Sequence, residues 1–225
     1  MRCAVILSGC GVRDGSEIHE AVTAMLSLTE RGHAYECYAP DRWQTAVVDH
    51  AHGCMMEEKR NILVESARIA RGAIRDLKEA DLDTFDAVLL PGGFGAAIQL
   101  CDFGKAGARC KVDPELEVFL KNVQKAGKPI GLMCIAPVIA ARVFGDRAVR
   151  VTIGDDAETA RACEAMGARH VVCRHDEVCV DEALKIVTTP AYMKARDISQ
   201  CYASAKALVS ALEKLCVSNS ASPGA

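Results

Sequence analysis

The stretch that most constrains the fold is residues 128–137, which read Lys-Pro-Ile-Gly-Leu-Met-Cys-Ile-Ala-Pro. A short apolar run leads directly to Cys134, and a helical pattern rich in Ala, Val and Ile follows over 138–144 without a loop. Such an abrupt change from strand to helix strains the backbone of the residue on the turn and makes its side chain project from the sheet edge. The stretch therefore predicts a nucleophile elbow with Cys134 at its tip. Backbone N–H groups and the helix dipole at such a position favour the thiolate.

The rest of the chain alternates between strand and helix patterns. Short apolar or alternating runs that predict strands occur at 3–7, 35–39, 74–77, 87–90, 149–153, 170–173, 178–180 and 185–187. Helical periodicity between capping and stop signals occurs at 16–32, 61–71, 113–126, 155–167 and 197–216. Periodicity breaks down over 41–58, which resembles an inserted hairpin that would form a lid or a dimer contact. We expect an α/β fold, a three-layer sandwich around a mainly parallel sheet. It forms a single domain over 1–217, and 218–225 form a disordered tail.

Composition excludes several classes of partner. The chain has 225 residues, a net charge of -3 and no basic run, so nothing favours nucleic acid. No apolar stretch reaches the roughly 18 residues that a membrane span needs, so we expect no membrane partner. The first residues lack the features of a secretory signal. We therefore expect a cytoplasmic protein, with a mitochondrial or other organellar location as the alternative if a transit peptide has been removed.

The twelve cysteines invite a disulfide or zinc interpretation. No two of them have Cys-x-x-Cys spacing, and no other cluster has convincing metal-ligand spacing, so we predict no metal site. Most lie in apolar runs, where a thiol behaves as a small core hydrophobe. Cys134 differs from the others because it lies on the predicted turn between a strand and a helix.

A second loop suited to ligand binding follows the strand at 87–90 and reads Pro91-Gly92-Gly93-Phe94-Gly95. Adjacent glycines at the carboxyl end of a strand let backbone N–H groups approach a ligand closely. The alternative is that these glycines only permit a sharp turn. An earlier Gly-rich loop at 9–15 has a carboxylate, Asp14, where a dinucleotide-binding loop needs its third glycine.

Several segments together carry a resemblance to a known family. They are 8–11 with 14–20, 90–95, 131–137, 152–154 and 185–193. These segments resemble the ElbB family of amidotransferase-like proteins. More distantly they resemble the class I glutamine amidotransferase superfamily, with its PfpI-type proteases and the parkinsonism-associated glyoxalase and deglycase. The resemblance implies a flavodoxin-like fold, a homodimer, no cofactor, and an enzyme that converts methylglyoxal or glyoxal to the hydroxy acid without glutathione.

The resemblance also assigns roles to residues. In the glyoxalase relatives a glutamate on the first helix faces the elbow cysteine, which makes Glu20 the candidate proton shuttle beside the nucleophile Cys134. Glu17, one turn earlier, competes for this role, and a solvated helix position is the alternative for Glu20. The resemblance implies that the substrate is a small 2-oxoaldehyde. Its oxyanion would be held by the N–H groups of Gly93 and Ile135, within a binding loop that also includes Gly92, Phe94 and Gly95.

Two other functions stay open. The first is a redox-sensing or chaperone-like dimer in which Cys134 is oxidised. The second is a glutaminase subunit, which needs a Cys-His-Glu triad. His175-Asp176-Glu177 has the His-x-Glu spacing but lies in a charged stretch typical of a surface turn. His19 precedes Glu20, but adjacent helix positions diverge by about 100°, so the two do not share a face.

Overall fold

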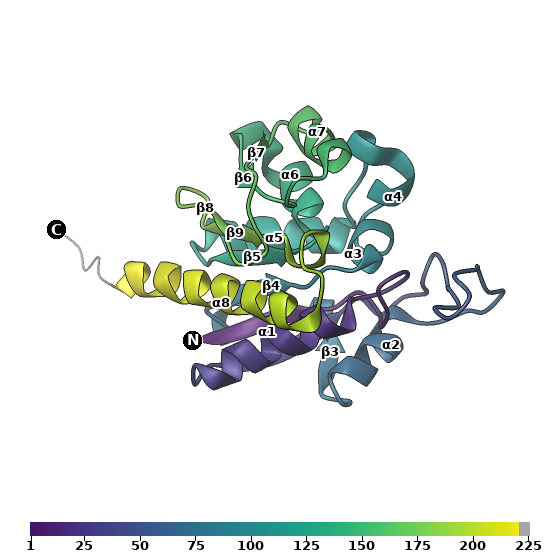
Figure 1. The fold of residues 1–225 in the computed structure, drawn as a ribbon. Coiled ribbons are helices and arrows are strands. Elements are labelled where there is room, and N and C mark those ends of the chain that lie inside the picture. Colours follow the sequence, from purple (N-terminus) through teal and green to yellow (C-terminus); the bar gives the residue numbers. More distant parts are fainter. Residues whose placement is uncertain (221–225) are drawn as a thin grey trace.

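The centre of the structure, a computed structural model that describes residues 1–220, is a seven-stranded sheet (Figure 1). Its strands are β1 (Arg2–Ile6), β2 (Ala34–Ala39), β3 (Ile74–Asp76), β4 (Ala87–Leu90), β5 (Ile130–Met133), β8 (Cys179–Asp181) and β9 (Ile186–Thr189). They lie in the order β3-β2-β1-β4-β5-β9-β8, and every neighbouring pair is parallel except β8 and β9. The predicted mainly parallel sheet is therefore confirmed, with one antiparallel edge.

Helices cover both faces of this sheet (Figure 1). They are α1 (Ile18–Glu30), α2 (Ile62–Ile69), α3 (Phe94–Ile98), α4 (Phe103–Ala106), α5 (Pro114–Lys125), α6 (Pro137–Phe144), α7 (Ala157–Ala165) and α8 (Ile198–Ser220). Single 3₁₀ turns occur at Leu77–Glu79, Leu82–Thr84, Gly107–Arg109, Gly145–Arg147 and Ala191–Met193. Helices α1 and α8 lie side by side on one face, and α5 and α6 pack on the other. This is the flavodoxin-like three-layer sandwich that the sequence predicts.

The central strands explain why the sheet is covered on both sides. Every residue of β4, β5 and β9 is buried, and so is every residue of β1 except Arg2. These strands read as continuous apolar runs because both faces of a parallel sheet need a covering layer of helices.

Residues predicted as strands at 149–153 and 170–173 form only a small separate sheet. Strands β6 (Arg150–Val151) and β7 (Arg169–His170) pair in parallel, and α7 lies between them in the chain. Two backbone N–H groups of this segment donate to side chains of the main sheet. The Arg150 N–H donates to Asp181 at 2.9 Å, and the Thr152 N–H donates to the Thr188 hydroxyl at 2.8 Å. The segment is thereby held beside β8 and β9 without extending their ladder.

The inserted segment 41–58 forms the expected hairpin. The Asp49 N–H donates to the Cys54 carbonyl at 2.9 Å, and the Met56 N–H donates to the Val47 carbonyl at 2.8 Å. In Figure 1 this hairpin projects from the right side of the sandwich. Whether it forms a dimer contact stays a prediction.

The last helix is longer than expected. Helix α8 runs to Ser220, three residues into the segment predicted to be a disordered tail, and residues 221–225 lie outside the described residues. Among residues 1–220, no helix combines the length and the hydropathy that crossing a membrane requires.

The strand order fixes where a ligand can bind. From β1 the chain moves outward to β2 and β3, and it then crosses to β4 on the other side of β1. Ligands of open parallel sheets bind beyond the carboxyl ends of the strands at such a switch point. The loops after β1 and β4 meet at this point, and the turn after β5 lies next to them.

Candidate active site

Cys134 lies on a strained turn between β5 and α6. Its backbone φ is +59°, in the left-handed region that non-glycine residues rarely adopt. The Cys134 N–H donates to the Thr189 carbonyl at 3.0 Å, which ties the turn to the end of β9. The predicted elbow is therefore present. The cysteine side chain is buried but forms part of the wall of a cavity.

Glu20, in the first turn of α1, is the carboxylic acid that meets Cys134. Its side chain is fully buried, and its carboxyl group lies close enough to the Cys134 thiol for each group to affect the acidity of the other. The Gly92 N–H donates to Oε2 at 2.8 Å, and the Tyr192 N–H donates to Oε1 at 3.1 Å. These bonds bring segments from the start, middle and end of the chain to one carboxyl group. Glu17 instead caps α1, because its Oε2 accepts from the Glu20 N–H at 2.7 Å.

Burial changes the acidity of both groups. It raises the pKa of Glu20 to about 7, with a further contribution from Glu17. Burial also raises the pKa of the Cys134 thiol well above its ordinary value, and the Glu20 charge acts in the same direction. The predicted lowering of the thiol pKa is therefore wrong. Helix α6 begins only at Pro137, and its dipole does not outweigh the desolvation of a buried sulfur beside a carboxyl group.

The two predicted oxyanion donors, Gly93 and Ile135, face the cysteine sulfur. The backbone N–H groups of Gly93 and Ile135 lie near the Cys134 sulfur and act to lower its pKa. The other N–H groups of the glycine loop donate to other acceptors. The Gly92 N–H donates to Glu20, the Phe94 N–H to the Val12 carbonyl at 2.7 Å, and the Gly95 N–H to the Gly15 carbonyl at 3.0 Å. The loop as a whole is therefore not an anion cradle, and only Gly93 and Ile135 point donors at the sulfur.

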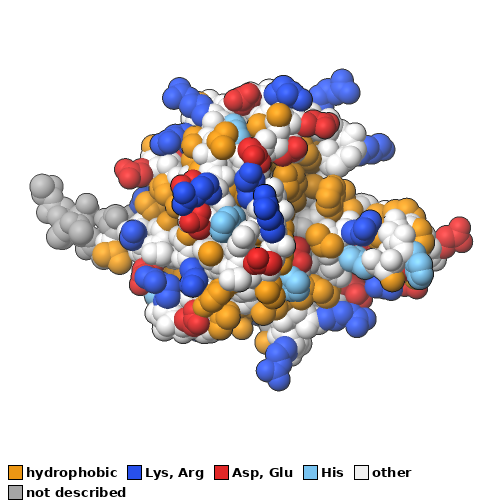
Figure 2. All heavy atoms as spheres, in the orientation of Figure 1, with side chains coloured by type: hydrophobic (Ala, Val, Ile, Leu, Met, Phe, Trp, Pro, Cys, Tyr) orange, Lys and Arg blue, Asp and Glu red, His pale blue; other side chains and the backbone are white. Residues whose placement is uncertain are grey.

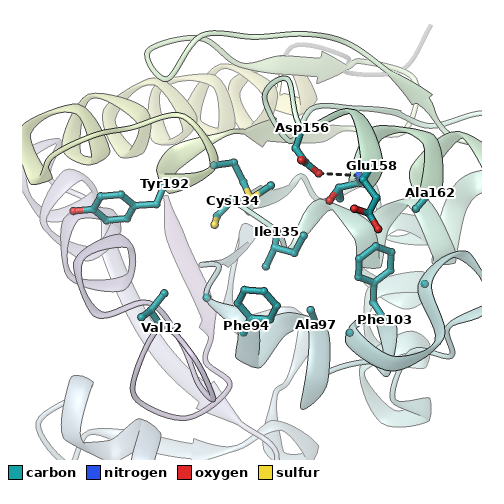
Figure 3. Close-up of a pocket in the computed structure, with 15 residues that line it drawn as sticks. Val12, Phe94, Ala97, Phe103, Cys134, Ile135, Asp156, Glu158, Ala162 and Tyr192 are labelled. Carbon is teal, nitrogen blue, oxygen red and sulfur yellow. Dashed lines mark hydrogen bonds between the residues drawn. The ribbon is translucent and has the colours of Figure 1, made fainter. Parts of the chain in front are cut away.

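The remaining glycine-loop residues have packing or lining positions. The Phe94 side chain is half exposed and lines the cavity (Figure 3). A Cβ on Gly95 would lie 2.4 Å from Ser8 Oγ, so this glycine permits close packing of the loops after β1 and β4.

The cavity beside Cys134 has a volume of about 650 Å³. It is lined by Val12, Gly93, Phe94, Ala97, Phe103, Gly104, Gly107, Cys134, Ile135, Asp156, Glu158, Thr159, Ala162, Tyr192 and Met193. Figure 3 shows Cys134 and Ile135 in the middle, Tyr192 and Val12 at one end, and Phe103 with Glu158 at the other. Glu20 is not among the lining residues, and it adjoins the cavity through Cys134. In the part of the chain that the structure describes, no group of His, Cys, Asp or Glu side chains is arranged to hold a metal ion.

No histidine of residues 1–220 lines the cavity at Cys134. His19 Nδ1 is 2.8 Å from the Tyr192 hydroxyl, so His19 reaches the cavity only through that tyrosine. His175-Asp176-Glu177 forms a turn in which Arg174 pairs with both carboxylates, and none of the three lines the cavity. Within residues 1–220, no histidine is among the groups that act on Cys134.

Tyr192 is the functional candidate that sequence reasoning missed. It supplies a backbone donor to Glu20 and a side chain to the cavity wall. Ala191 before it has a φ of +44°, which aims this backbone at the site. Strain of this kind cannot be read from an alanine, although the Pro190-Ala191-Tyr192 sequence after a buried strand marks a sharp turn.

Gly92 lies between the two reactive groups. A Cβ at this position would lie 2.4 Å from the Cys134 Cβ and 2.7 Å from Glu20 Oε2. Gly92→Ala is therefore expected to destabilise the fold by about 1–3 kcal/mol through overpacking. It should also lower kcat/KM of the activity proposed below by about 100-fold, because it separates the two groups. Urea denaturation and steady-state kinetics measure the two effects.

Gly72→Ala is the matched control for this substitution. Position 72 also has no side chain, and an added Cβ there would meet nothing within 4 Å, although its φ of +82° strains an alanine. The control is expected to retain full activity. Full activity in Gly92→Ala would mean that the Cys134–Glu20 contact does not matter for turnover.

The raised pKa of Glu20 predicts how stability depends on pH. Between its ordinary value of 4.5 and about 7, the folded chain holds a proton that the unfolded chain has lost. Stability due to this group is therefore fully present below pH 4.5 and is lost as the pH rises through 7, a change of about 3 kcal/mol. Glu20→Gln should remove this component from the pH dependence of the unfolding free energy. Parallel curves for the two proteins between pH 4.5 and 8 would contradict the assignment.

Comparison with known proteins agrees with this architecture. No family model matches the chain. It is 36% identical to an isoprenoid biosynthesis protein with an amidotransferase-like domain from Ehrlichia chaffeensis. Their structures agree with a TM-score of 0.88 over 95% of this chain and 99% of that one. A ThiJ/PfpI domain protein from Brachyspira murdochii shares the fold, with a TM-score of 0.58 at 16% identity and coverage of 98% and 97%. The fold and the cysteine elbow thus define an amidotransferase-like protein.

Relatives define the family more closely. The chain is 49% identical, over 202 residues, to the human glutamine amidotransferase-like class 1 domain-containing protein 3, mitochondrial, and the match covers 85% of this chain and 75% of that protein. It is 45% identical to the ES1 protein homolog, mitochondrial, of Rattus norvegicus over 218 residues, covering 92% and 81%. The chain therefore belongs to the family of glutamine amidotransferase-like class 1 domain proteins, which includes the ES1 proteins.

Proposed function

We propose that this protein is a glutathione-independent glyoxalase-type enzyme that converts 2-oxoaldehydes such as methylglyoxal and glyoxal to 2-hydroxy acids. One observation carries the proposal: a buried carboxyl group with a pKa of about 7 lies beside a thiol, and two backbone N–H groups face the same sulfur at a cavity wall. These are a nucleophile, a proton shuttle and an oxyanion site in mutual reach.

The reaction begins with thiol addition. Glu20, as carboxylate, takes the proton of the Cys134 thiol while the sulfur attacks the aldehyde carbon, C1. The oxygen on C1 becomes an oxyanion, which the Gly93 and Ile135 N–H groups stabilise until it accepts the proton from Glu20. The product of this step is a hemithioacetal, and Glu20 is again a carboxylate.

Proton transfer between the two carbons follows. Glu20 removes the hydrogen on C1, and the electron pair moves to give an enediolate. Glu20 then returns the proton to C2, and the hydroxyl proton on the C1 oxygen passes to the C2 oxygen, which leaves a 2-hydroxyacyl thioester on Cys134. Water cleaves the thioester and restores the thiol. The net reaction adds one water to the oxoaldehyde, so no oxidant or reductant is consumed.

The acidities of Glu20 and Cys134 suit this mechanism. A carboxyl group with a pKa of about 7 is balanced between acid and base at neutral pH, which suits a group that both donates and accepts. Burial keeps the thiol protonated until Glu20 takes its proton, so nucleophile formation and substrate binding are coupled.

The other two functions have less support. A thiol whose pKa is raised reacts slowly with peroxide, because the thiolate is the reactive form. A glutaminase of the Cys-His-Glu type needs an imidazole at the sulfur, and Glu20 holds that position. The glyoxalase reaction uses the groups that are actually in contact.

We also propose a mitochondrial location, in place of the cytoplasmic one that the sequence favours. Three relatives, from Homo sapiens, Rattus norvegicus and Danio rerio, carry the word mitochondrial in their names. Within the superfamily, we propose a grouping with the ElbB proteins, supported by the motif residues at 90–95 and 131–137.

The proposed activity is tested by incubating the purified protein with methylglyoxal in the absence of glutathione and measuring lactate by chromatography. The expected result is lactate that forms in proportion to enzyme and that is absent with Cys134→Ala. If lactate formation equals that of the variant, the proposal is wrong. Ammonia release from glutamine in the same preparation would support the glutaminase function instead.

A further inference from the structure

The cavity at Cys134 is much larger than a methylglyoxal molecule requires. Its volume of about 650 Å³ lies in the range of roughly 300–1,000 Å³ that is typical of sites for drug-sized ligands. Methylglyoxal carries only one methyl group beside its two carbonyls. Most of the cavity would stay filled with water if that were the substrate to which the site is matched.

The wall of the unused part is mostly apolar, and Asp156, Glu158 and Thr159 also line this end. Beyond Ile135 it is lined by Phe94, Ala97, Phe103 and Ala162, which come from α3, α4 and α7 (Figure 3). On the face seen in Figure 2, hydrophobic side chains gather between the upper part of the molecule, which carries α7, and the projecting hairpin. Transfer of a hydrophobic group from water into such a region is favourable by about 25 cal/mol per Å² of apolar surface.

The charges around the cavity have one sign. Asp156 and Glu158 are the charged side chains of its lining, and no Lys, Arg or His is among the lining residues within the described part of the chain. Lys194, next to the lining residue Met193, pairs with Asp155 at 2.5 Å. A substrate with a carboxylate or phosphate far from its reacting carbons would meet carboxylates in a region of low polarity, and like charges placed together in this way oppose binding.

We propose that the site is matched to 2-oxoaldehydes that carry a bulky, uncharged hydrophobic group, and that methylglyoxal is a minor substrate. This assignment rests on the function proposed above, because Cys134 and Glu20 would act on the same two carbons. The dicarbonyl lies at Cys134, and the hydrophobic group extends over Ile135 toward Phe103 and Ala162. Phenylglyoxal represents this class, and addition of one water converts it to mandelate.

The test compares kcat/KM for three aldehydes: phenylglyoxal, methylglyoxal and 4-carboxyphenylglyoxal. Phenylglyoxal is expected to exceed methylglyoxal by about tenfold or more, since each added carbon in an apolar pocket contributes severalfold to specificity. The carboxylated compound is expected to fall at least about tenfold below phenylglyoxal. Products are quantified by chromatography from initial rates. Because phenylglyoxal also modifies arginine, enzyme pre-incubated with it is assayed again with methylglyoxal.

Variants locate the preference within the cavity. Ala162→Leu fills the apolar end and should lower the ratio of the phenylglyoxal to the methylglyoxal kcat/KM by about fivefold or more. Arg161→Leu adds the same side chain at the next position of α7, which does not line the cavity, and should leave that ratio unchanged. Glu158→Gln removes a carboxylate from the far end and should raise kcat/KM for 4-carboxyphenylglyoxal relative to phenylglyoxal.

The possible failures are distinguishable. If none of the three aldehydes is converted, the proposed function fails and this assignment fails with it. If methylglyoxal is converted as efficiently as phenylglyoxal, or if Arg161→Leu changes the ratio as much as Ala162→Leu does, the glyoxalase function stands and the assignment of substrate class is overturned.

Discussion

Cys134→Ala is expected to lower kcat/KM for the conversion of methylglyoxal to lactate by about 1,000-fold or more, because no covalent intermediate can form without the sulfur. The substitution leaves the backbone unchanged, since alanine and cysteine experience similar strain at a φ of +59°. Serine at this position keeps a hydrogen-bonding group beside Glu20, but a hydroxyl is a far weaker nucleophile. We expect Cys134→Ser to be nearly as inactive as Cys134→Ala.

Cys179→Ala provides the control for this experiment. Cys179 is also a buried thiol, on the edge strand β8, and it does not line the cavity. It should retain wild-type kinetics, and urea denaturation should show that every variant is folded. If Cys134→Ala and Cys179→Ala had equal activity, the sulfur at the elbow would have no catalytic part.

Glu20→Gln is expected to lower kcat/KM by about 10²–10⁴-fold, the usual contribution of a general acid–base group. The wild-type kcat/KM should rise with pH to a plateau and have an apparent pKa near 7, because the reaction starts from the Glu20 carboxylate. The variant should lose this rise. A loss of activity without a change in the pH profile would indicate a positioning effect instead of proton transfer.

Glu17→Gln separates Glu20 from its acidic neighbour. Glu17 caps α1 and helps to raise the pKa of Glu20. Its replacement should therefore move the rise in kcat/KM to lower pH and leave the plateau within a few-fold of wild type. If the plateau fell as far as it does in Glu20→Gln, Glu17 would be the shuttle.

The fold could be predicted because its signals are local. The buried strands of a parallel sheet appear as continuous apolar runs, and the strand that leads into Cys134 has no room for a loop before its helix. The strands predicted at 149–153 and 170–173 are longer than β6 and β7 in the structure. The side chains of Asp181 and Thr188 accept hydrogen bonds from backbone N–H groups that would otherwise pair with a neighbouring strand. A sequence pattern does not reveal such competition between distant residues.

The site was predictable only in part. Cys134 follows from the elbow, and Glu20 followed from the family resemblance. The sequence did not reveal that the pKa of the Cys134 thiol is raised. This shift depends on the burial of the thiol and on its distance from a carboxyl group in another part of the chain. The sequence also did not reveal that the N–H groups of Phe94 and Gly95 are already hydrogen-bonded, since their acceptors belong to the loop after β1.

The hydrogen bonds of Glu20 join distant parts of the chain. Its carboxyl group joins Gly92 and Tyr192, which lie 72 and 172 residues further along the chain. During synthesis the elbow and its first-helix glutamate are made long before Tyr192, so the carboxyl group reaches its final hydrogen bonds only when the end of β9 has docked. The full set of hydrogen bonds at this carboxyl group therefore depends on the last third of the chain, although Glu20 itself lies near its start.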